Sequence, residues 1–163
     1  MRVGWIERVS LPAMGLHAIA AKIDTGARTS ALHISAARRV ALEEGDGDRL
    51  VVELLGPRLP RKQRTIELEV EDWVFVRDTS GRRQRRPIIR TQLLLGTRRI
   101  TIRLGLTDRG DMRYPLLVGR TALPAGTLVD PHHRYLLGIP ARSERGRATG
   151  VIRTPGRSRG GKI

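Results

Sequence analysis

Residues 20–33 read AAKIDTGARTSALH, and the interpretation of the whole chain depends on this stretch. It places Asp24 in the compact turn signal Asp24-Thr25-Gly26, with Lys22 before it and Arg28 after it. A glycine two residues after an aspartate permits a tight turn and a close backbone approach, and a threonine hydroxyl can make a buried hydrogen bond. Because these residues are also common in ordinary turns, Asp24 is either a catalytic carboxylate or an acid that starts a turn.

Composition limits the class of protein. A chain of 163 residues suits one domain with its own core. Its 31 Lys and Arg against 16 Asp and Glu give a formal net charge of +15, which favours an acidic partner. The absence of cysteine excludes a disulfide framework and a Cys-based zinc site. Since no apolar run approaches the roughly 20 residues of a membrane span, we expect a soluble, cytoplasmic protein with no membrane partner.

Most of the chain has strand patterns. Residues 64–71 (RTIELEVE) alternate apolar and acidic side chains, and residues 99–106 alternate in the same way. Two apolar arms, 73–76 and 88–95, flank the basic sequence RDTSGRRQRR, which predicts a long hairpin with its tip at 78–86. Further strands are expected at 2–9, 15–23, 31–40 and 49–55, with a loop at 43–48 and a short helix near 119–123. This pattern predicts an all-β barrel or sandwich.

The last 23 residues differ in composition from the rest. The segment 141–163, ARSERGRATGVIRTPGRSRGGKI, is rich in Gly, Ser and Arg and poor in sizeable apolar groups. Such a segment cannot bury enough surface to offset its ordering entropy. The sequence therefore predicts a domain at 1–140 followed by a disordered basic tail at 141–163.

A second segment supports the catalytic interpretation of Asp24. The sequences IDTGA at 23–27 and PLLVGRTAL at 115–123 resemble the two halves of a retropepsin subunit, and the 73–95 hairpin lies where the flap belongs. The wider pattern adds RPIIRT, LTDRGDMRY and VDPHHRYL, and it is similar to the retropepsin-like proteins often called ATP-dependent zinc proteases. The resemblance implies an all-β retropepsin-like closed barrel with a flap hairpin and one short C-terminal helix.

The resemblance also implies an activity. Aspartic proteases use two carboxylates that share a proton, one acting on water and the other on the scissile carbonyl. Because this chain has a single Asp-Thr-Gly, an aspartic endopeptidase of this type requires a C2 homodimer with one Asp24 from each chain. By resemblance, Thr25 hydrogen-bonds across the dimer, Gly26 lets the substrate backbone lie close, and the hairpin closes over the peptide. The substrate-binding residues implied in the same way are Lys22, Ala27, Arg28, Arg90, Val118 and Arg120.

Two positions suggest an acidic substrate. Lys22 should share a strand face with Asp24 and line the cleft. Retropepsins usually have an apolar residue at the position of Lys22 and an acid at that of Arg28, so both departures add positive charge. An acidic or glutamate-rich peptide is then the expected substrate, in keeping with the family's association with glutamate-adding ATP-grasp ligases. Alternatively, Lys22 reaches solvent and Arg28 pairs with a carboxylate such as Asp108. The missing acid would also deprive Arg120 of its usual partner.

Neither zinc nor ATP dependence has a sequence motif. The histidines do not form an HExxH pair, and the chain contains neither G-x-x-x-x-G-K-[ST] nor G-x-G-x-x-G after a strand. We therefore predict no metal and no cofactor. The four histidines are His17, His33, His132 and His133.

Two other functions fit the sequence. The arginines of the tail and the hairpin tip are typical of segments that bind phosphate backbones, so an RNA- or ribosome-associated binding module is one alternative. Only five aromatic residues are present, which argues against a platform that stacks single strands. The other alternative is a catalytically silent retropepsin fold that serves as a scaffold.

Overall fold

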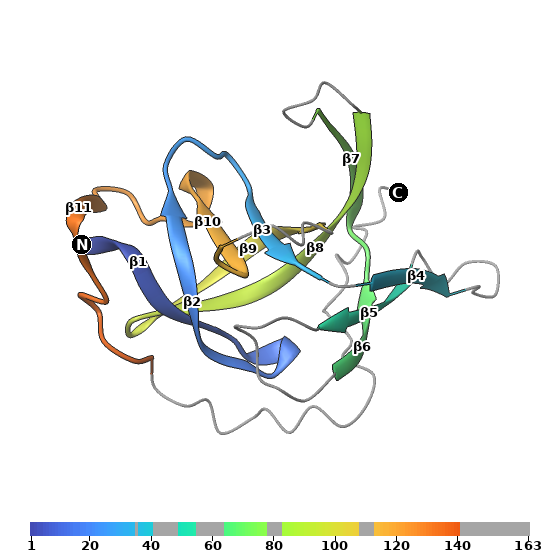
Figure 1. The fold of residues 1–163 in the computed structure, drawn as a ribbon, viewed down its shortest axis with the longest axis horizontal. Coiled ribbons are helices and arrows are strands. Elements are labelled where there is room, and N and C mark those ends of the chain that lie inside the picture. Colours follow the sequence, from blue (N-terminus) through green and yellow to red (C-terminus); the bar gives the residue numbers. More distant parts are fainter. Residues whose placement is uncertain (35, 41–48, 55–63, 78–82, 108–112, 141–163) are drawn as a thin grey trace, which may run out of the picture.

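The computed structural model describes residues 1–34, 36–40, 49–54, 64–77, 83–107 and 113–140 (Figure 1). The predicted loop at 43–48, residues 78–82 of the hairpin tip and the predicted tail at 141–163 lie outside the described residues. The described part is all-β, with two three-residue 3-10 turns, η1 (Pro12–Met14) and η2 (Arg120–Ala122). Its strands are β1 (Arg2–Leu11), β2 (Leu16–Asp24), β3 (Ser30–His33), β4 (Ala36–Val40), β5 (Arg49–Leu54), β6 (Arg64–Glu69), β7 (Asp72–Arg77), β8 (Arg83–Leu95), β9 (Arg98–Thr107), β10 (Leu116–Gly119) and β11 (Leu128–Arg134).

Eight of these strands form one sheet, in the order β11-β1-β2-β10-β3-β9-β8-β7. A further pairing, Val9 with Leu95 and Ser10 with Leu94, joins β1 to β8. The six strands from β1 to β8 in this order therefore close into a ring, with β11 and β7 attached outside it (Figure 1). The antiparallel strands β4, β5 and β6 make a separate sheet, whose buried residues join the same hydrophobic core.

The strand patterns of the sequence match burial in the structure. In β6, Ile66 and Leu68 are buried while Glu67 between them is partly exposed. In β9, Ile102 and Leu104 are buried on either side of exposed Arg103. Because side chains alternate between the faces of a strand, one face of each element supplies the core. The all-β prediction is confirmed, as are both arms of the 73–95 hairpin.

Three local expectations need adjustment. Residues 31–40, expected as one strand, form β3 and β4 in different sheets. The strand β11 was missed because it contains Pro131, which a sheet tolerates at its edge. The expected helix is only the turn η2, closed by the 3.2 Å bond from Leu123 N to the Arg120 carbonyl, since Pro124 has no N–H with which to continue it.

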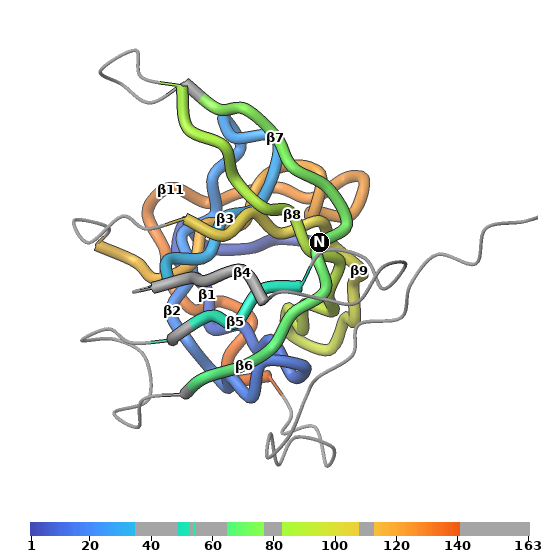
Figure 2. Tube along the Cα trace, turned by 90° about the vertical axis from the view of Figure 1, so that its right-hand side faces the viewer, coloured from blue at the N-terminus to red at the C-terminus, as the bar shows by residue number. Residues whose placement is uncertain are grey.

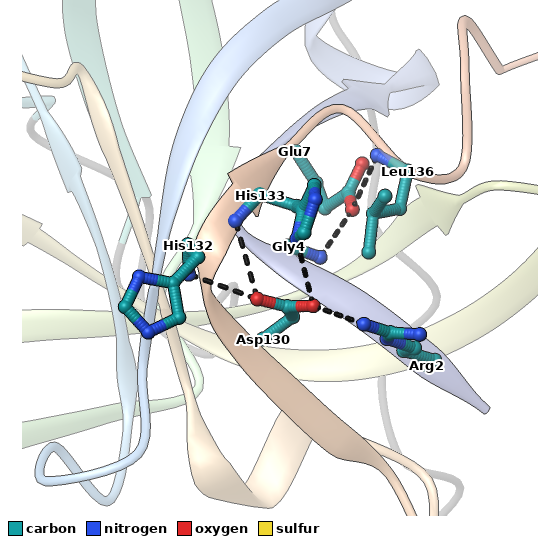
Figure 3. Close-up of polar contacts among 7 residues, drawn as sticks. All are labelled: Arg2, Gly4, Glu7, Asp130, His132, His133 and Leu136. Carbon is teal, nitrogen blue, oxygen red and sulfur yellow. Dashed lines mark hydrogen bonds and ion pairs between the residues drawn. The ribbon is translucent and has the colours of Figure 1, made fainter.

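A buried carboxylate ties the C-terminal segment to β1. Glu7 has no exposed surface, and its Oε1 accepts hydrogen bonds from the backbone N–H groups of Gly4 at 2.6 Å and Leu136 at 3.0 Å (Figure 3). Its Oε2 accepts a third from Leu137 at 3.2 Å. A Cβ on Gly4 would lie 2.5 Å from the carbonyl oxygen of His133, so only glycine lets β11 pack this closely on β1.

Asp130 makes a second polar anchor in the same region. It accepts hydrogen bonds from the Arg2 guanidinium, from the backbone N–H of His132 at 2.8 Å and from Nδ1 of His133 at 2.9 Å (Figure 3). The Arg2 hydrogen bond, followed by that from His132, holds the pKa of Asp130 well below its ordinary value. The carboxylate therefore stabilises the β1–β11 pairing in its ionised form.

The Asp130 anchor makes the stability of the fold depend on pH. A carboxylate whose pKa is lower in the folded than in the unfolded chain contributes stability above the unfolded value, about 3.9, and this is lost as pH falls through the folded value. We expect Asp130→Asn to lower the midpoint of thermal unfolding at pH 7 and to reduce the acid-induced loss of stability. Thermal unfolding between about pH 7 and pH 2 measures both, with the exposed Asp72→Asn as control. An unchanged acid profile in Asp130→Asn would contradict the assignment.

Candidate active site

The position of Asp24 is set by the way three strands meet. Strand β2 ends at Asp24, and β10 runs parallel to it with Gly119 opposite Asp24. On its other side β10 pairs with β3, so it separates two strands that follow each other in the chain. The segment between Asp24 and Ser30 must therefore pass around the end of β10.

Backbone hydrogen bonds hold this segment in place. The backbone N–H of Arg120 donates to the Ala27 carbonyl at 2.8 Å, and its Nη1 donates to the Gly26 carbonyl at 2.9 Å. From the other side, the N–H of Gly119 donates to the Ser30 hydroxyl at 3.1 Å. Since these bonds bracket the turn, Asp24 sits on a rigid support rather than on a loose loop.

Close contact also explains the glycine in this support. A Cβ on Gly119 would lie 2.6 Å from the carbonyl carbon of Thr29 and 2.8 Å from its oxygen. The φ angle of Gly119 is −75°, which any residue can adopt, so space rather than backbone conformation requires glycine here. The turn and β10 can approach to this distance only without a side chain at 119.

The Asp24 carboxylate has one neutral and one charged neighbour. Its Oδ1 accepts a hydrogen bond from the backbone N–H of Ala27 at 3.2 Å. Its Oδ2 lies 4.0 Å from Lys22 Nζ, on the same face of β2. The side chain of Asp24 is 27% exposed and that of Lys22 is 46% exposed, so both are reachable from solvent.

A cleft of about 410 Å³ opens over Asp24. Asp24 and Ala27 lie on one side of it. The hairpin β7–β8 forms the opposite side, and Figure 2 shows its arms extending away from the rest of the molecule. A peptide in this cleft would lie between the carboxylate and the hairpin, whose contributing side chains are Val74, Val76, Arg86 and Ile88.

Two arginines give this cleft a positive character. Arg86 and Arg103 both line it, while Asp24 is the one acid among the lining residues that the structure describes. Arg103 is partly balanced, because its Nη2 lies 2.6 Å from an Asp72 oxygen. Arg86 donates through Nε to the neutral side chain of Gln84 at 3.1 Å. Both guanidinium groups add positive charge to the cleft.

Comparison with known proteins identifies the family. The family model for the retropepsin-like aspartic endopeptidase RimB matches residues 2–139. The chain belongs to this RimB-like family. A curated relative from Parasynechococcus marenigrum, named a probable alpha-L-glutamate ligase, is 39% identical over an alignment of 140 residues that covers 83% of this chain and 29% of the relative. A relative of the same name from Shewanella pealeana is 34% identical over 83% of this chain and 30% of its own length.

A solved structure is also similar to this RimB-like chain. The crystal structure of a Legionella pneumophila protein of unknown function has a TM-score of 0.67 and 26% sequence identity, covering 83% of this chain and 97% of that one. The RimB-like chain therefore corresponds to nearly the whole of that protein. By contrast, it spans only about 30% of the length of the curated relatives that it matches.

Four other site residues expected from the sequence lie on the turn after Asp24 or bind to it in this RimB-like chain. Thr25 and Gly26 are exposed beside Asp24, and their carbonyls accept from Arg120. Arg120 thus has backbone partners in place of the acid missing at position 28. Arg28 is exposed, and its carbonyl accepts the Thr121 hydroxyl at 2.7 Å.

Lys22, which was expected to line the cleft, is not among its lining residues, and neither are Arg90 and Val118. Arg90 forms an ion pair with Glu71, and Val118 is fully buried in the core. Asp108, the alternative partner of Arg28, is outside the described residues. The structure therefore brings Lys22, Asp24 and Ala27 together.

The sequence predicted positive charge in the cleft but from other residues, and it did not indicate that Arg86 and Arg103 line it. The alternation of β8 carries a signal for Arg86, because it shares a face with the apolar Ile88. Arg103 has no local signal of this kind, since its place depends on the pairing of β9 with β8, which puts it opposite Arg90. A residue such as Arg103 can be assigned to the cleft only when the register between the strands is known.

The described part of the RimB-like chain offers no metal centre. No three of its His, Asp or Glu side chains come together in an arrangement that could hold an ion. His17 shares a hydrogen bond with Ser10, and His133 binds Asp130. Within the same residues, no helix is long and apolar enough to cross a membrane.

The contact at Gly119 makes a prediction about stability. Gly119→Ala should destabilise the RimB-like domain by about 1–3 kcal/mol, because the added methyl group meets backbone that cannot move aside. Gly105→Ala is a matched control, since its Cβ would lie at an ordinary 3.4 Å from Ile88. Urea unfolding compares the two variants with the natural chain. Equal midpoints for all three would contradict the tight contact.

Proposed function

We propose that this RimB-like chain is an aspartic endopeptidase that works as a C2 homodimer. The observation that carries the proposal is the placement of Asp24 on a rigid turn, in a cleft covered by the β7–β8 hairpin. One chain supplies one Asp-Thr-Gly, so a second copy would supply the other carboxylate. A cytoplasmic location remains a prediction of the sequence.

The chemistry needs the two Asp24 side chains to share one proton. The ionised carboxylate takes a proton from a water molecule as its oxygen attacks the peptide carbonyl carbon, and the protonated one donates to the carbonyl oxygen. The C–N bond then breaks, the departing nitrogen receives the proton held by the first carboxylate, and one hydroxyl of the tetrahedral intermediate returns its proton to the second carboxylate, which restores the dyad. The hairpin would exclude bulk water from this step through Val74 and Val76.

The ligase name of the relatives does not conflict with hydrolysis. This chain matches less than a third of their length, so the ligase activity in their name can belong to the portion of the relatives outside the match. Its sequence contains neither G-x-x-x-x-G-K-[ST] nor G-x-G-x-x-G after a strand. A relative that joins a glutamate ligase to a RimB-like portion does suggest the substrate class, namely a peptide carrying added glutamates.

The charges of the cleft agree with such a substrate. Arg86 and Arg103 line the cleft, and outside its lining Lys22 Nζ lies 4.0 Å from Asp24 Oδ2. A substrate carboxylate in the space between Asp24 and the hairpin would meet the arginines, and one that lies beyond Asp24 would meet Lys22. An acidic peptide is therefore the proposed substrate.

The dyad is tested by replacing Asp24. Asp24→Asn should abolish hydrolysis of a glutamate-rich peptide and leave the dimer intact, because the amide can neither activate water nor share the proton. Peptide cleavage followed by mass spectrometry and sedimentation velocity are the two measurements. Glu67→Gln, on the separate three-stranded sheet, is the control expected to stay active. Full activity in Asp24→Asn would exclude the mechanism, and a scaffold role would follow if the natural chain proved inactive.

The acidic preference is tested separately at Arg86. Loss of one charge-assisted hydrogen bond of about 1.5–3 kcal/mol should raise KM for a glutamate-rich peptide roughly tenfold or more in Arg86→Gln. Cleavage of a matched glutamine peptide should change little. Arg98→Gln, at the exposed start of β9, removes the same charge elsewhere. If Arg86→Gln changed the KM for the glutamate and glutamine peptides equally, Arg86 would not recognise the glutamate carboxylates.

A further inference from the structure

The β7–β8 hairpin has a second face that the proposed cleavage does not use. Val74, Val76 and Arg86 point toward the cleft. Since neighbouring residues of a strand point to opposite faces, the outer face of the hairpin carries the residues in between. This outer face is defined here by Trp73, Phe75, Arg83 and Arg85.

Arginine and aromatic side chains are layered on the outer face. The Cζ atom of Arg85 lies 4.5 Å from the centre of the Trp73 ring, and that of Arg83 lies 5.6 Å from the centre of the Phe75 ring. In the register, Phe75 is opposite Arg85, so each guanidinium crosses diagonally to the neighbouring ring. These contacts are cation–π interactions.

The outer face is open to a ligand and positively charged. Phe75 is 68% exposed, and Arg83 and Arg85 are exposed as well. The acids next to the outer face in sequence are Glu71 and Asp72, and they form ion pairs with Arg90 and Arg103. Among the described residues no carboxylate pairs with either arginine of the outer face.

We propose that the outer face of the hairpin binds single-stranded nucleic acid. A guanidinium group that stacks on a ring still presents its edge N–H groups, which can donate to phosphate oxygens. The exposed ring of Phe75 and the planes of the arginines can stack with unpaired bases. The low aromatic content argued against such a platform, but two of the five aromatic residues lie together on this one hairpin.

The aromatic component selects among acidic ligands. A duplex keeps its bases stacked inside, and an acidic peptide has carboxylates but no flat group to place on Phe75. A duplex or an acidic peptide would therefore bind through the arginine charges alone. A single strand can bind through both the aromatic rings and the charges. This face lies opposite the cleft side of the hairpin, so the binding does not depend on the proposed peptidase activity.

The test measures fluorescence anisotropy of a labelled oligouridylate of roughly 12 nucleotides with the full chain, at about 0.15 M salt. Phe75→Leu removes the ring without changing charge, and the double variant Arg83→Lys with Arg85→Lys keeps charge but loses the stacking plane. We expect each to weaken binding about fivefold or more, as befits one lost stacking contact. Thermal unfolding confirms that each variant is folded.

The control is the double variant Arg98→Lys with Arg99→Lys, on exposed positions of β9. It should change the affinity less than about twofold, since it alters the same residue types away from the hairpin. Duplex RNA of equal length and polyglutamate should bind more weakly than the single strand. The proposal is overturned if the hairpin variants match the control, or if the duplex or polyglutamate binds as tightly, because charge alone would then account for binding.

Discussion

The contact between Gly119 and the backbone of Thr29 is the constraint on which the candidate site depends. Strand β10 can lie between β2 and β3 only if the turn after Asp24 passes closely around its end. The same approach lets Arg120 reach the carbonyls of Gly26 and Ala27. In the proposed homodimer, such support would hold Asp24 in place relative to its symmetry mate, and catalytic geometry tolerates little displacement.

The two faces of the β7–β8 hairpin differ in character because side chains alternate between the faces of a strand. Its inner side combines valines with Arg86, and its outer side combines rings with Arg83 and Arg85. At its base, Glu71, just before β7, binds Arg90 of β8 and Arg103 of β9, and Asp72 of β7 also binds Arg103. These pairs are partly exposed and individually weak, but they connect three strands at the place where the hairpin leaves the sheet.

The termini are joined by buried and partly buried acids rather than by apolar contacts alone. Glu7 accepts three backbone N–H groups, and Asp130 binds Arg2. In a chain with an excess of positive charge, these carboxylates are placed where they satisfy backbone donors and cations. The β1–β11 pairing thus depends on a few acidic residues far apart in sequence.

The sequence by itself determined the elements that depend on local pattern. Alternation at Ile66 and Leu68 predicts a strand because neighbouring side chains must point to opposite faces. The two apolar arms around a basic turn predict the hairpin, and Asp24-Thr25-Gly26 together with Gly119-Arg120 indicates the family and the candidate carboxylate.

Only the tertiary structure decided which distant residues meet. It divided 31–40 between two sheets, paired the Pro131 strand with β1, turned Arg120 toward backbone carbonyls and brought Arg103 into the cleft. Each of these depends on the register between strands far apart in the chain, which no local pattern encodes. Closure of the ring by β1 and β8 sets those registers together, and with them the surroundings of Asp24.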